Sequence, residues 1–190
     1  MKISLFFCGD IVNTINDTNF ICPELIKIIK NQDISVCNFE APIKSLEKSL
    51  PKAGPSIFQK KNTIGILKDS GFNVLLLANN HILDFGEKGL SLTIDEINRN
   101  DLSYIGAGIN SKLAYKPLIK KINGITISII NACEAQFGVL DDPQVINKPG
   151  YAWINDPRID NLVISSKKYS DIVIVCPHAG LENYSIPMLE

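Results

Sequence analysis

Short apolar runs alternate with polar, turn-rich segments along this chain of 190 residues. Four runs predict buried β-strands, because each is short, strongly apolar and bounded by glycine or polar clusters. They span residues 3–8, 34–37, 74–77 and 171–177. Two further runs, 118–122 and 125–130, flank an Asn-Gly pair and predict a β-hairpin, since both turn positions need a positive φ.

Helical periodicity fills most of the intervals between these runs. Amphipathic or capped patterns predict helices over residues 23–30, 63–70, 86–100 and 158–169. Residues 131–154 have no such period and predict a long irregular loop, which in a compact domain is usually functional. Strands that alternate with helices, together with a hairpin, predict a mixed α/β sandwich.

Composition and charge fit one globular enzyme-sized domain. The chain is 45% apolar and 21% charged with a net charge of −1, so no nucleic-acid-binding footprint is visible. The first apolar run stops at Gly9–Asp10, far short of the ~20 residues that a membrane span needs, and no cleavage site follows. Five cysteines without a Cys-x-x-Cys pair favour a reducing compartment over a zinc ribbon. We therefore expect no transmembrane segment and a cytoplasmic location.

Polar residues follow each of the four predicted strands directly. They are Asp10 after the first, Asn38 and Glu40 after the second, Asn79, Asn80, His81 and Asp84 after the third, and His178 and Glu182 after the fourth. Ligands bind at the carboxyl ends of strands in α/β sheets, and these side chains are of the types that bind divalent metals. Asp84 lies three residues after His81 and can orient it. Each short motif alone could equally be a turn or a helix cap.

The ordered set Gly-Asp, Asn-Phe-Glu, Asn-Asn-His-x-x-Asp-x-Gly and His-x-Gly-x-Glu resembles the CapA-like proteins of poly-γ-glutamate capsule synthesis. They are a branch of the calcineurin-like metallophosphoesterases. The segment 40–43 and the loop 105–110, followed by Ala114 and Pro117, fit the same family, and the resemblance runs from residue 2 to about 187. It implies an α/β/β/α sandwich with mixed sheets.

The resemblance also implies a centre of two divalent ions, in which Mn, Fe and Zn cannot be told apart from sequence. Asp10 would bind one ion, Glu40 would bridge both, and Asn80 and His178 would bind the second. His81 would act as general acid or as the group that stabilises the leaving oxygen, positioned by Asp84. Further substrate contacts are expected from Asn38, Asn79, Glu182 and Lys52. A salt bridge is the alternative for Glu182, and a plain surface position for Lys52.

The implied reaction is hydrolysis of a phosphoester or γ-glutamyl-type bond, with an anionic polymer or a small molecule as substrate. Two departures point away from simple phosphoesterase activity: Ile11–Val12 replaces the usual x-His after Asp10, and Glu40 stands where related enzymes use Asp. The alternative is a non-catalytic component of capsule assembly or export, working with other capsule-synthesis proteins around a vestigial or structural metal site. An SGNH-type esterase is excluded because Ile11 cannot act as its nucleophile, and the glycines at 106 and 108 do not complete a dinucleotide-binding motif.

No histidine follows His178, whereas CapA-like proteins have a later Gly-x-His-Pro-His-type motif. We therefore expect residues 1–188 to be part of a longer metallophosphoesterase-type domain that continues into further strands, with Leu189–Glu190 resembling a cloning scar. On this hypothesis the metal site is incomplete or empty in this chain. The uncovered strand edge should also make the chain self-associate.

Overall fold

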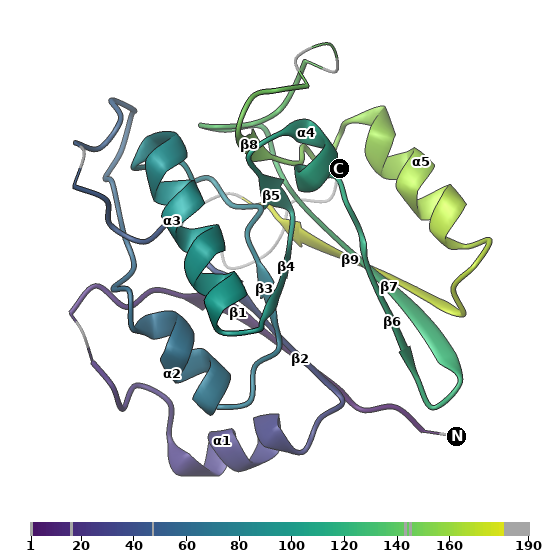
Figure 1. Cartoon of the computed structure of the whole chain (residues 1–190). Helices are drawn as coiled ribbons and strands as arrows, with labels where there is room; N and C mark the ends of the chain where they lie inside the picture. Colours follow the sequence, from purple (N-terminus) through teal and green to yellow (C-terminus); the bar gives the residue numbers. More distant parts are fainter. Residues whose placement is uncertain (1, 16, 47, 143, 145, 181–190) are drawn as a thin grey trace.

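Two β-sheets lie face to face in the computed structural model, which describes residues 2–15, 17–46, 48–142, 144 and 146–180 (Figure 1). The first sheet is parallel, in the order β1 (Leu5–Ile11), β2 (Ile34–Phe39), β3 (Val74–Leu76) and β4 (Ser103–Ile105). The second is mixed, in the order β6 (Leu118–Ile122), β7 (Ile125–Cys133) and β9 (Ile172–His178). β6 runs antiparallel and β9 parallel to β7.

Alternating side chains of the strands build two different cores. Ile34 and Val36 of β2 share one apolar cluster with Ile127 and Ile129 of β7, so this cluster lies between the sheets. Phe39, one of the alternate residues of β2, packs in another cluster with residues of the helices. Because successive side chains of a strand point to opposite faces, both faces of the first sheet are covered by a buried apolar cluster.

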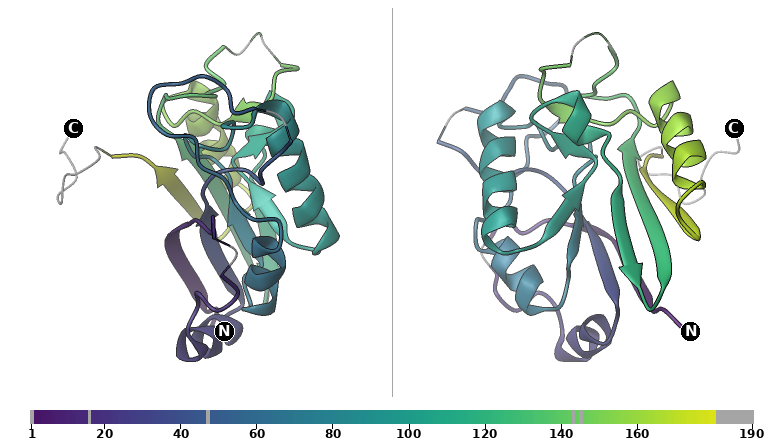
Figure 2. Two further views of the ribbon diagram at one scale, coloured as in Figure 1. Left: turned by 90° about the vertical axis from the view of Figure 1, so that its left-hand side faces the viewer. Right: turned by 45° about the vertical axis from the view of Figure 1, so that its right-hand side comes forward.

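Helices cover the outer faces of both sheets. α1 (Pro23–Lys30), α2 (Thr63–Asp69) and α3 (Gly86–Arg99) lie on the first sheet, and α5 (Pro157–Ser166) lies on the second (Figures 1 and 2). The predicted α/β/β/α sandwich is therefore confirmed, with helix bounds within three residues of those expected. No helix among the described residues is both long and apolar enough to cross a membrane.

The sequence prediction was wrong in the region after α3. Residues 131–133 extend β7, and the expected loop contains β8 (Gly150–Tyr151), which pairs with β5 (Ala107–Gly108). The short strands β4 and β5 and the helix α4 (Ser111–Ala114) were not predicted. Elements of two to four residues are too short to display a period, so they depend on tertiary pairing.

Candidate functional site

Three side chains meet where β1, β2 and β9 end. The amide Nδ2 of Asn38 donates to Asp10 Oδ1 at 2.6 Å and lies 3.1 Å from His178 Nδ1. His178 Nδ1 is itself 3.6 Å from Asp10 Oδ1. The register of β1 on β2 shifts between Cys8 and Asp10, so Gly9 is an extra residue that directs Asp10 toward this group.

Glu40 lies at the end of β2 within electrostatic range of the same group. Burial raises the pKa of its half-buried carboxyl, the charge of Asp10 raises it further, and His178 and His81 lower it. A half-buried Glu40 carboxyl whose ionisation is disfavoured by the charge of Asp10, with imidazoles nearby, is an arrangement that a cation would stabilise.

His81 and Asp84 form a close pair in the turn after β3. His81 Nδ1 lies 2.7 Å from Asp84 Oδ2, and the Asp84 side chain is fully buried. Lys52 makes an ion pair with Asp84 Oδ1, and its Nζ lies 2.9 Å from His81 Nδ1. Only 7% of the Lys52 side chain is exposed, so the plain surface position considered for this lysine is wrong.

The two asparagines before His81 have different surroundings. Asn79 is fully buried; its Oδ1 accepts from the backbone N–H groups of Ala41 and His81, and its Nδ2 donates to Phe39 O. This side chain holds the turn and is not placed to touch a substrate. Asn80 Nδ2 donates to Gln136 Oε1 at 2.8 Å, while its buried Oδ1 has no hydrogen-bond partner among the described residues.

Sequence reasoning missed Asn131, a buried residue of β7. Its Oδ1 accepts from the N–H of Ala78 at 2.8 Å, and its Nδ2 donates to the carbonyl of Cys176 at 2.9 Å. One side chain thus ties the end of β3 in the first sheet to β9 in the second. The available signal was an amide at the end of the apolar run 125–130.

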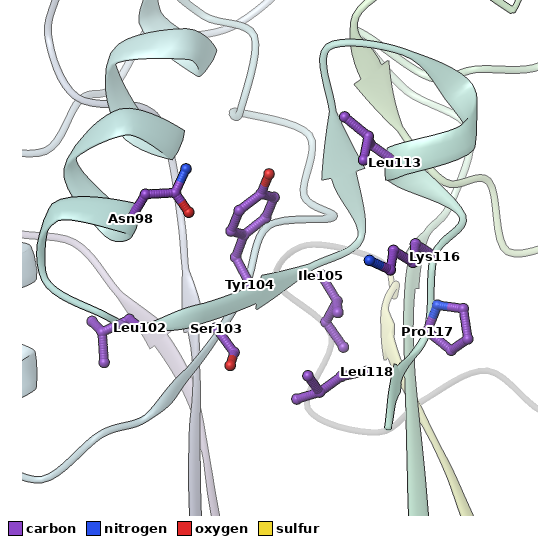
Figure 3. Close-up of a pocket in the computed structure, with 9 residues that line it drawn as sticks. All are labelled: Asn98, Leu102, Ser103, Tyr104, Ile105, Leu113, Lys116, Pro117 and Leu118. Atoms are coloured by element: carbon purple, nitrogen blue, oxygen red, sulfur yellow. The ribbon is translucent and has the colours of Figure 1, made fainter. Parts of the chain in front are cut away.

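A pocket of about 550 Å³ opens beside His81. Its lining residues are Lys52, Ala53, Gly54, Pro55, Asn80, His81, Gln136 and Phe137. A second hollow, of about 250 Å³, lies between the end of α3, β4 and the start of β6, and Figure 3 draws its lining residues. None of the predicted site residues lines that second hollow, so we exclude it from the candidate site.

The donor types at the strand ends suit a divalent cation, but they do not form a compact cluster here. Among the described residues no group of three or more His, Cys, Asp or Glu side chains has the spacing of a metal site. Asp10 and His178 are together, and the unpartnered oxygen of Asn80 is a further candidate ligand. Glu182 and Leu189–Glu190 lie outside the described residues.

Comparison with known proteins gives capsule-synthesis relatives. The "Capsule biosynthesis protein CapA" of Bacillus anthracis is 31% identical over 95% of this chain and 47% of its own length. The "PGA biosynthesis protein CapA" of Bacillus subtilis is 30% identical over 82% of this chain and 41% of its own length. The chain therefore spans somewhat less than half the length of these relatives.

Solved structures share the fold at low sequence identity. A 5′-nucleotidase candidate from Staphylococcus aureus superposes with a TM-score of 0.56 at 15% identity, over 97% of this chain and 39% of its own. The NAD nucleotidase of Haemophilus influenzae gives 0.52 at 14% identity, over 84% of this chain and 28% of its own. A family model described as "Bacterial capsule synthesis protein PGA_cap" matches residues 4–188. From this match, which spans nearly the whole chain, we conclude that the protein belongs to the PGA_cap family of bacterial capsule synthesis proteins.

Proposed function

We propose that this chain carries the catalytic face of a metal-dependent hydrolase that acts in the synthesis of a poly-γ-glutamate-type capsule. The observation that carries the proposal is the contact between Asp10 and His178, both at strand ends, with the His81–Asp84 pair within electrostatic range of the adjoining Glu40 carboxyl. Metal donors and a proton-transfer pair in one region are the parts that metal-assisted hydrolysis needs.

Divalent cations fit the residues at the centre by their chemistry. Asp10, Glu40, Asn80 and His178 would hold the ions, and the ions would supply charge stabilisation and an activated water. Asn38 Nδ2 now presents its hydrogens to Asp10 Oδ1 and His178 Nδ1, the same two atoms that a cation would use. A bound cation would therefore require the Asn38 amide to turn aside.

His81 would hold the proton that the leaving group needs. Its Nδ1 is engaged by Asp84 and Lys52, and no described residue makes a hydrogen bond to its Nε2. Nε2 is thus the ring nitrogen left for the substrate, and Asp84 fixes the ring. The pocket beside His81 would receive the part of the substrate next to the scissile bond, a phosphoester or a γ-glutamyl amide of a polymer or small molecule.

The test is metal-dependent turnover by the purified full-length protein. We expect hydrolysis of at least one member of a panel of phosphoesters and γ-glutamyl amides after incubation with Mn²⁺, Fe²⁺ or Zn²⁺, and loss of it with a chelator. Asp10→Asn should abolish the metal-dependent rate. Lys48→Met, at an exposed lysine of the loop formed by residues 44–61, should leave that rate unchanged. Turnover that survives both chelation and Asp10→Asn would refute the proposal.

A non-catalytic role in capsule assembly is the second candidate. It is favoured by the absence of a three-ligand group among the described residues and by the Asn38 amide that occupies the space between Asp10 and His178. On this alternative the protein acts through other capsule-synthesis proteins. It predicts metal-independent binding of such partners and no turnover of any panel member by the metal-loaded protein.

A further inference from the structure

The side chain of Lys52, beside His81, is only 7% exposed, and the residue lies on a loop rather than on a strand or helix. It comes from the polar connection 44–61, and its ammonium reaches the fully buried carboxylate of Asp84. The same ammonium lies 2.9 Å from His81 Nδ1 and 3.4 Å from the carbonyl oxygen of Asn80, and it sits over the ring of Phe137.

These contacts engage the Lys52 ammonium on several sides. It pairs with Asp84 Oδ1, lies 3.4 Å from the carbonyl oxygen of Asn80, and can donate to His81 Nδ1 when that nitrogen carries no proton. Its charge is compensated by Asp84 in a buried pair. A direct contact between Lys52 and an anionic substrate stays a prediction for this lysine, which also lines the pocket.

Asp84 in turn anchors the whole loop on both sides of Lys52. Its Oδ2 accepts from the N–H of Ile57 at 2.8 Å, and its backbone carbonyl accepts from the N–H of Leu50 at 2.8 Å. The residues between these anchors, Ala53 to Pro55, form one wall of the pocket beside His81. Lys52 stands at the point where this wall, the turn after β3 and His81 are joined.

From these contacts we propose that Lys52 is a positioning residue, which fixes the orientation and hydrogen bonding of the His81 ring and the pocket wall 53–55. Nδ1 has a partner in either protonation state, because it donates to Asp84 Oδ2 when it carries a proton and accepts from Lys52 Nζ when it does not, while Nε2 stays free. The consequence for catalysis rests on the proposed function, whereas the positioning itself does not.

The test uses nuclear magnetic resonance of the ring nitrogens in the metal-free protein, which contains only two histidines. Lys52→Met should shift the ring-nitrogen resonances of His81 and leave those of His178 in place. Lys48→Met, the matched change at an exposed lysine of the same loop, should leave both rings unchanged. Unchanged His81 resonances in Lys52→Met, or equal shifts of both rings, would overturn the proposal.

A measurement on the unmodified protein covers the case in which Lys52→Met does not fold. The buried Lys52 ammonium should give a slowly exchanging N–H signal at neutral pH, with cross-relaxation to the His81 ring, and Lys48 should not. Absence of that signal would also overturn the proposal. If the protein is an active hydrolase, Lys52→Met should lower kcat by about 10²-fold with little change in KM, because displaced catalytic groups cost rate rather than binding. An inactive protein with the expected ring shifts would refute the proposed function and leave the positioning role standing.

Discussion

His178 and Asp10 approach to 3.6 Å although they end strands of different sheets, and the Asn38 amide bridges them. The contact joins the carboxyl ends of β1 and β9. It gives the candidate metal centre one oxygen and one nitrogen donor at a shared position, which is the starting point for the predictions that follow.

Removal of one of these donors should weaken metal binding. Loss of an outer partner of a metal ligand typically costs 10–100-fold in affinity, so loss of the ligand itself in His178→Ala should cost at least roughly that much. Titration calorimetry with Mn²⁺ and Zn²⁺ measures the effect, with His81→Ala as the control that keeps its affinity. Equal affinities of His178→Ala and the unmodified protein would remove His178 from the centre.

In the full-length protein, His81→Ala should separate proton transfer from metal binding. Because a general acid contributes by proton donation in the transition state, turnover should fall by ~10²–10⁴ while metal content is largely retained. Steady-state kinetics and elemental analysis of the same preparation check this. Loss of metal in proportion to activity would instead make His81 a ligand.

Asn131→Ala should destabilise the fold and loosen the two sheets at the site. The change leaves the Ala78 N–H without its acceptor and the Cys176 carbonyl without its donor, and each buried unpaired group costs about 1–3 kcal/mol. Urea unfolding measures the loss. Asn131→Asp keeps the acceptor for the Ala78 N–H but loses the donor to the Cys176 carbonyl, so its loss of stability should come from the Cys176 side alone. A change in unfolding free energy of less than about 0.5 kcal/mol in Asn131→Ala, within the range of ordinary surface substitutions, would contradict the bridging role.

Asp156→Asn should give a pH-dependent loss of stability. Burial disfavours the charge of Asp156, but the hydrogen bonds and charge of Arg158 outweigh burial and lower its pKa. A pKa that is lowered in the folded state stabilises the protein at pH values above the unfolded pKa of about 3.9. This stabilisation is lost as the pH falls through the folded pKa. Asn still caps α5, so the cost of about 1.5–3 kcal/mol at pH 7 reflects the charged hydrogen bonds.

Unfolding curves at several pH values provide the check on Asp156→Asn. The stability difference from the unmodified protein should be constant between pH 7 and 5 and should shrink below about pH 4. A difference that does not vary with pH would assign the effect to packing instead of charge.

The edge of β9 should promote self-association. Among the described residues β9 pairs only with β7, and Ile172 and Val175 are 41% and 37% exposed. Exposed apolar edge strands recruit other chains, and a lysine on the edge opposes this. Light scattering should show oligomers of the unmodified protein. The oligomeric fraction should decrease in Val175→Lys and should stay the same in Ile28→Lys, a matched change on the surface of α1. A monomer at all concentrations would contradict the prediction.

The sequence by itself determined the sandwich and the strand ends of the candidate site. Strand and helix patterns are local properties, and the apolar runs that form β2 and β9 are long enough to display them. Ligands bind at the carboxyl ends of strands in α/β folds, so Asp10 and His178 could be expected to converge from the sequence, although it did not show that they belong to different sheets. The His81–Asp84 pair was equally accessible, because one turn of chain joins them.

Only the tertiary structure decided which partners these residues have. Lys52 comes from a loop with no period, and its pairing with Asp84 depends on how residues 44–61 fold back over the turn after β3. The sequence placed Asn131 in the predicted loop 131–154, and its bridge between the sheets exists only once they are stacked. The same holds for Asn38 between Asp10 and His178. Contacts between residues far apart in sequence depend on the packing of whole sheets, which leaves no pattern in the local sequence.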